Sequence, residues 1–173
     1  MERTADLVAA FIRARAVGPV VVVDHSMGTQ VAVEVAARHP DLVQNVVLIA
    51  PTVNRRERTA QQGCGSHRIS PSKALVSSSW ARESVRAGPR LRAKMRAMLV
   101  HRPEIIYPRV RVPTLVLRGE NDDVCPRSWC RFVAASLPHG RLAEVPGHGH
   151  ETMIRDAEPA AAMIRTFVKR SVS

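Results

Sequence analysis

The sequence predicts an α/β protein built on a parallel sheet of about four strands, and two observations predict this class. Two apolar runs rich in β-branched residues, 20–23 and 46–50, lack the polar alternation of a strand with one face in water. Such runs are typical of strands that are covered on both faces, as parallel sheets require. Helical patterns separate successive runs, and this alternation of strands and helices is typical of a parallel sheet with helices on both faces.

The elements follow in a regular order along the chain. A first amphipathic helix is expected at 6–17, because apolar side chains recur there at helical spacing and Gly18-Pro19 ends the pattern. The other expected elements are a strand at 20–23, a helix at 27–38, strands at 46–50 and 113–119, a helix at 129–137, a strand at 142–145 and a closing helix at 157–169. The turn between residues 23 and 27 must be very tight.

A basic insertion is expected between two parts of one core, 1–53 and 112–173. Residues 54–111 hold 14 basic and 3 acidic side chains, in a chain with 26 Lys and Arg, 15 Asp and Glu and a net charge of +11. Their pattern is polar and weakly periodic. The segment 90–100 is the most helical part, with apolar and basic side chains on different faces. We therefore expect a helical insertion on an otherwise regular fold.

Composition excludes several classes of protein. No apolar run approaches the roughly 20 residues that cross a bilayer, and the first ten residues do not resemble a leader, so we expect a cytoplasmic protein. Cys64, Cys125 and Cys130 form no CxxC pair, which favours free thiols over a disulfide framework or a structural metal site. Aromatic residues make up 3% of the chain, which argues against nucleic-acid binding by base stacking.

A serine stands at the tight junction between the first strand and the second helix. In the run Val23-Asp24-His25-Ser26-Met27-Gly28, a sharp turn would push the seryl oxygen out over the edge of the sheet. The Met27 amide would then point to where an oxyanion forms. The motif matches G-x-S-x-G at Ser26 and Gly28, whereas Asp24 replaces the first glycine. The spacing predicts a nucleophile.

Candidates for the acid and the base that a serine nucleophile needs follow later strands. Asp122 comes directly after the strand at 113–119, and His148 and His150 lie in a glycine-rich loop after the strand at 142–145. Because the carboxyl ends of parallel strands gather at one edge, these side chains could meet there. As alternatives, Asp122 or Asp123 could do no more than cap the next turn, and either histidine could be a solvated loop residue.

Taken together, the segments DHSMG, VVLIAPT, VPTLVLRGEND and EVPGHGH resemble the C-terminal two thirds of an α/β-hydrolase-fold enzyme. The resemblance implies that Ser26 is the nucleophile, Asp122 the orienting acid and His150 the general base, with His148 the weaker candidate. It also implies that the insertion corresponds to the cap that shapes the substrate pocket. In the family, four strands and a helix precede this segment. We therefore expect an N-terminally shortened sheet in which Met27 supplies the one remaining oxyanion donor.

The function expected from this resemblance is hydrolysis of a small-molecule ester or related carbonyl through a Ser-Asp-His triad, with no metal or cofactor. An alternative is an impaired hydrolase remnant that acts as an interaction module. Such a module would self-associate, or bind a partner chain, through the exposed sheet edge at 20–23. A third possibility is binding of nucleic acid or an anionic surface through residues 54–111.

Overall fold

The computed structural model describes residues 1–52, 96–153 and 156–172, and we confine structural statements to them. The elements with defined bounds are, in chain order, α1 (Glu2–Arg15), β1 (Val20–His25), η1 (Ser26–Gly28), α2 (Thr29–Arg38), η2 (Pro40–Leu42), β2 (Val43–Ile49), α6 (Pro103–Ile106), η3 (Tyr107–Arg109), β3 (Thr114–Gly119), α7 (Arg127–Ser136), β4 (Gly140–Val145) and α8 (Glu158–Val172). The chain divides into two compact units, residues 1–52 with 102–173 and residues 53–101.

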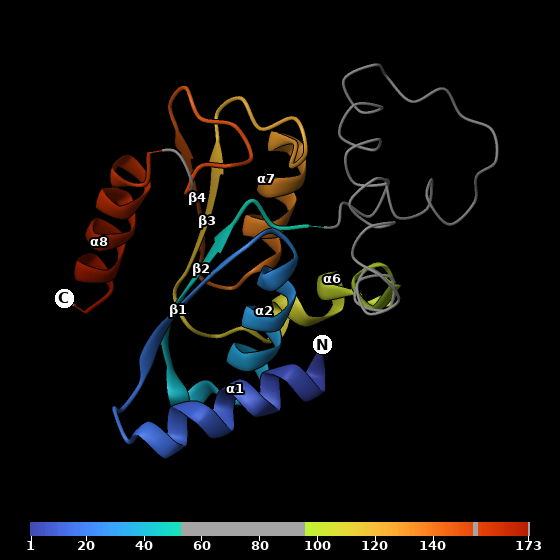
Figure 1. The fold of residues 1–173 in the computed structure, drawn as a ribbon, viewed down its shortest axis with the longest axis vertical. Coiled ribbons are helices and arrows are strands. Elements are labelled where there is room, and N and C mark those ends of the chain that lie inside the picture. Colours follow the sequence, from blue (N-terminus) through green and yellow to red (C-terminus); the bar gives the residue numbers. More distant parts are fainter. Residues whose placement is uncertain (53–95, 154–155, 173) are drawn as a thin grey trace. The chain divides into compact units, whose positions relative to one another are not determined.

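The first unit contains a four-stranded parallel sheet with the strand order β1-β2-β3-β4. Helices α2 and α7 pack on one face of the sheet and α8 covers the other, as Figure 1 shows. Helix α1 packs on α2. The predicted fold class, a parallel sheet of four strands flanked by helices, is confirmed. All four strands run in one direction, so their carboxyl ends lie along one edge of the sheet.

Burial differs strongly between the strands. Val46–Ile49 of β2 and all six residues of β3 are buried, as expected for strands covered on both faces. In β1 every residue keeps some exposure, and Val23 is 43% exposed. Within the described ranges β1 pairs only with β2. Self-association through this edge stays a prediction, and light scattering tests it, since a monomer at high concentration would contradict it.

The structure adds short elements that the sequence patterns did not predict. The helix expected at 27–38 begins at Thr29, because the 3₁₀ turn η1 comes first. Residues 102–111, which we expected in the insertion, belong to the first unit, where α6 and η3 contact α2 and Tyr107 is buried in the core. Of the helix expected at 90–100, residues 96–100 are helical and the remainder lies outside the described residues.

The two described cysteines are free thiols, as expected, and Cys64 lies outside the described residues. Cys125 and Cys130 are buried with their Sγ atoms 3.2 Å apart. The hydrogen bond with Cys130 and burial both raise the pKa of the Cys125 thiol, so it stays protonated and weakly nucleophilic. In the described ranges, no helix is long and apolar enough to cross a membrane.

Candidate functional site

Ser26 occupies a strained corner between β1 and η1. His25, the last residue of β1, is extended, whereas Ser26 has a φ of 53°, in the left-handed region that residues other than glycine seldom adopt. The Thr29 hydroxyl donates a hydrogen bond to the Ser26 carbonyl at 2.6 Å and holds the turn closed. This is the tight strand-to-helix turn that the sequence predicted, and it lies at the carboxyl end of β1.

This strain leads to a stability prediction. Ser26→Gly is expected to have a free energy of unfolding about 1 kcal/mol higher than Ser26→Ala, because only glycine adopts a positive φ without steric cost. Both variants lack the hydroxyl, so the comparison isolates the backbone. Denaturant unfolding of the two variants measures the difference. Equal stabilities would mean that the turn relaxes when the serine side chain is removed.

Asp122 lies in the loop after β3, and its side chain is fully buried. Its Oδ1 accepts hydrogen bonds from the amides of Val124 at 2.9 Å and Cys125 at 2.8 Å, while its Oδ2 lies 2.9 Å from His150 Nδ1. The sequence left open whether Asp122 caps a turn or contacts a histidine, and its side chain does both. One oxygen caps the turn, and the other contacts the histidine.

His150 lies between Asp122 and Ser26. Its Nε2 is 3.2 Å from Ser26 Oγ, and its side chain is 19% exposed. Because a carboxylate only accepts, Nδ1 donates to Asp122, which leaves Nε2 free to accept the Ser26 hydroxyl proton. His148 instead donates from Nδ1 to the carbonyl of Pro146 at 2.8 Å, within its own loop. Of the two candidate histidines, the structure brings His150 to Ser26.

Arg118 organises the loop that carries Asp122, residues 120–126, which we call the acid loop. The sequence did not predict this role. Arg118 is buried in β3, and its guanidinium donates to the carbonyls of Glu120 at 3.2 Å, Asp122 at 2.9 Å and Cys125 at 3.1 Å. It also pairs with Glu144 on β4. The available signal was a single arginine inside an otherwise apolar strand, since a buried charge needs several partners.

Asp24, the departure from the G-x-S-x-G pattern, is accommodated by Gly28. A Cβ atom on Gly28 would lie 1.8 Å from Asp24 Oδ1, so the carboxylate fills the space that a side chain at residue 28 would need. Asp24 Oδ1 accepts the His25 amide at 2.9 Å. Burial raises the pKa of the Asp24 carboxyl, and this hydrogen bond opposes the shift only in part.

The raised pKa predicts how stability depends on pH. Folded Asp24 holds its proton more tightly than the unfolded chain does, so its contribution to stability falls as the pH rises above about 3.8. Asp24→Asn keeps the acceptor oxygen without the charge. We expect the variant to have a higher melting temperature than the parent at pH 7, and this advantage to shrink as the pH approaches 4. An advantage that is constant with pH, or a loss at pH 7, would contradict the prediction.

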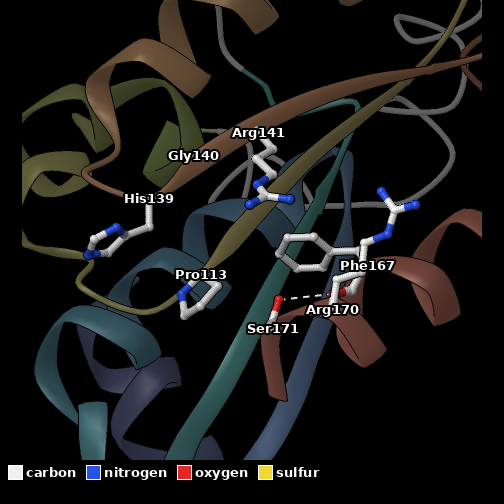
Figure 2. Close-up of a pocket in the computed structure, with 7 residues that line it drawn as sticks. All are labelled: Pro113, His139, Gly140, Arg141, Phe167, Arg170 and Ser171. Atoms are coloured by element: carbon white, nitrogen blue, oxygen red, sulfur yellow. Dashed lines mark hydrogen bonds between the residues drawn. The ribbon is translucent and has the colours of Figure 1, made fainter. Parts of the chain in front are cut away.

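A cavity of about 250 Å³ lies at the amino ends of the strands, the end of the sheet opposite to Ser26. Pro113 and Gly140, at the amino ends of β3 and β4, line it together with Phe167 and Ser171 of α8 (Figure 2). Ser26, Asp122 and His150 all follow carboxyl ends of strands, so this cavity is separate from the candidate site. Within the described ranges, no group of three or more histidine, cysteine or acidic side chains is arranged to hold a metal ion.

Comparison with known proteins points to one family. A sequence profile of the "Alpha/beta hydrolase family" matches residues 1–165. The chain is 24% identical over 185 residues to the "Putative carbamate hydrolase RutD" of Serratia proteamaculans (strain 568), covering 91% of this chain and 68% of that protein. Among solved structures, the chain is similar to E-2-(acetamidomethylene)succinate hydrolase, with 25% identity and a TM-score of 0.67 over 95% of this chain and 72% of that one. It is also similar in fold to CarC, a serine hydrolase involved in carbazole degradation, with 22% identity, a TM-score of 0.66, and coverage of 96% and 70%.

Proposed function

Since the chain belongs to the alpha/beta hydrolase family, we propose that it hydrolyses a small-molecule ester or related carbonyl compound at Ser26. One observation carries the proposal. His150 Nε2 lies 3.2 Å from Ser26 Oγ, and Asp122 Oδ2 lies 2.9 Å from the other ring nitrogen. These three side chains come from the segments that directly follow β1, β3 and β4. In a catalytic triad the base contacts the nucleophile through one ring nitrogen and the orienting acid through the other, which is the order of contacts here.

In the proposed reaction, His150 Nε2 takes the Ser26 hydroxyl proton as Oγ attacks the substrate carbonyl. The imidazolium formed is stabilised by the buried Asp122 carboxylate, and it then gives its proton to the leaving alkoxide, so an alcohol departs and an acyl-serine ester remains. A water molecule loses a proton to His150 and attacks the acyl carbon. The acid product departs, and Ser26 Oγ regains the proton from His150.

The Met27 amide is the proposed donor to the oxyanion of the tetrahedral intermediate. Met27 is the second residue of η1, so its N–H lies in the first turn, where a helix offers no acceptor of its own. One such donor typically contributes about 10² to 10³ in turnover. The basic insertion is proposed to act as the cap over the substrate, a role that falls mostly on residues outside the described ranges.

Names of similar proteins support a carbonyl substrate with a heteroatom leaving group. One relative is named for carbamate hydrolysis and another for hydrolysis of an acetamido compound, and both compounds contain a carbonyl group bonded to nitrogen. The match to a family of hydrolases also favours this proposal over an interaction module.

A fluorophosphonate probe tests the proposal without a known substrate, because it reacts with an activated serine. We expect one adduct per chain by intact mass, located at Ser26 by peptide mapping and absent in Ser26→Ala. Ser136 and Ser171, which donate hydrogen bonds only to helix carbonyls, serve as internal controls and should stay unlabelled. A folded chain that gains no adduct, or gains one elsewhere, would contradict the assignment of Ser26.

A further inference from the structure

The loop that carries His150 is held through three successive backbone carbonyls. The His148 carbonyl accepts the Asn121 amide at 2.8 Å, and the Gly149 carbonyl accepts the Thr152 hydroxyl at 2.7 Å. The third, the carbonyl of His150 itself, accepts a hydrogen bond from His25 Nε2 at 2.9 Å. The first donor, Asn121, lies in the acid loop, and the second, Thr152, lies in the same loop as His150. The third, His25, is the last residue of β1 and directly precedes Ser26.

His25 is well placed to fix the distance between the nucleophile and the base. It is the residue before Ser26 and the last in β1, where it pairs in register with Ile49 of β2. Its ring and the His150 ring have centroids 5.0 Å apart, tilted by 48°. Because a carbonyl oxygen can only accept, His25 Nε2 carries the proton in this bond.

This hydrogen bond joins two segments that are far apart in the sequence, the end of β1 and the loop that carries His150. The other contact between them at the site is a long one. The Ser26–His150 side-chain contact at 3.2 Å is longer than a typical O–H hydrogen bond of about 2.7–2.8 Å. The His25 bond reaches the backbone of the same histidine, so it does not depend on the protonation state of the His150 ring. It therefore persists when the ring gains and loses a proton in each cycle.

We propose that His25 is a positioning residue for the reaction at Ser26, which sets the place of His150 over the nucleophile by donating Nε2–H to the His150 carbonyl. This inference rests on the proposed function. It assigns His25 no contact with substrate and no proton transfer of its own. The role acts on the geometry of proton transfer and not on substrate binding, so its loss should lower kcat and leave KM unchanged.

Three variants separate the hydrogen bond from the ring. His25→Phe keeps a ring without a donor, His25→Gln keeps an amide N–H near the position of Nε2, and His25→Asn carries an amide that is one methylene too short. We measure the rate of fluorophosphonate labelling at Ser26, kcat and KM for a nitrophenyl ester, and the melting temperature. Displacement of a catalytic group by about 1 Å can cost about 10²-fold in rate.

We expect His25→Phe and His25→Asn to lose about 10²-fold in labelling rate and kcat at unchanged KM, and His25→Gln to recover most of the loss. If His25→Phe does not fold, the pair of amide variants decides the question alone. Equal rates for Gln and Asn, or labelling of His25→Phe at the parent rate, overturn the inference. Failure of the proposed function gives a different result, because the parent chain itself would then remain unlabelled.

Discussion

Replacing His150 by glutamine is expected to reduce ester turnover by about 10⁶-fold, the loss that follows removal of the base from a serine hydrolase triad. Glutamine can still donate a hydrogen bond toward Asp122 or Ser26, but its amide cannot accept the hydroxyl proton. The Nε2 atom of His150 lies 3.2 Å from Ser26 Oγ, within reach of the hydroxyl proton. Turnover of a nitrophenyl ester and the rate of fluorophosphonate labelling measure the effect.

His148→Gln is the matched control for this prediction. His148 lies two residues away in the same loop, but its ring bonds to the Pro146 carbonyl, and its own carbonyl is what holds Asn121. The control should therefore keep turnover within a few-fold of the parent. If the large loss follows His148 instead of His150, the weaker candidate of the sequence analysis would be the base.

Asp122→Asn is expected to lower kcat by about 10⁴-fold with little change in fold. Two backbone amides, those of Val124 and Cys125, donate to Asp122 Oδ1, so they fix the side-chain oxygen of asparagine in that position. The asparagine NH₂ group then faces His150 Nδ1. That nitrogen must accept, the imidazole proton moves to Nε2, and His150 can no longer take the proton of Ser26.

Asp123→Asn provides the control, since it removes the neighbouring carboxylate, which is exposed. Steady-state kinetics of the two variants, with melting temperatures to show that both are folded, measure the contrast. A similar modest loss in both would show that the loop charge, and not the tautomer of His150, is the property that Asp122 contributes.

The sequence could place the candidate residues near one another because parallel topology turns sequence order into spatial proximity. Once 20–23, 113–119 and 142–145 are recognised as strands, the residues after them must meet at one edge of the sheet. Ser26, Asp122 and His150 do lie within hydrogen-bond distance of one another in turn. Their catalytic roles remain predictions until the variants are measured.

Other contacts could not be predicted from local patterns. The His25 bond ends on a backbone carbonyl 125 residues away, and a backbone acceptor has no characteristic side chain in the sequence. Residues 103–110 look like part of a polar insertion, yet Tyr107 and Val110 are buried in the core of the first unit. Isolated apolar residues beside prolines give no periodic signal, so the burial of these two side chains could not be predicted from the local pattern.

The position of Ser26 directly after β1 has a consequence for inactivation. In the described part of the chain, β1 is held by a ladder to β2 alone, whereas β3, which leads to Asp122, has strands on both sides. Edge segments with partly exposed hydrogen bonds open at lower free energy than core strands. Amide hydrogens of β1 should therefore exchange faster than those of β2 and β3. β4, which leads to His150, is the other edge strand of the described sheet. On heating, Ser26 and His150 should therefore separate while the central strands β2 and β3 stay folded, so activity should be lost at a lower temperature than the bulk of the fold.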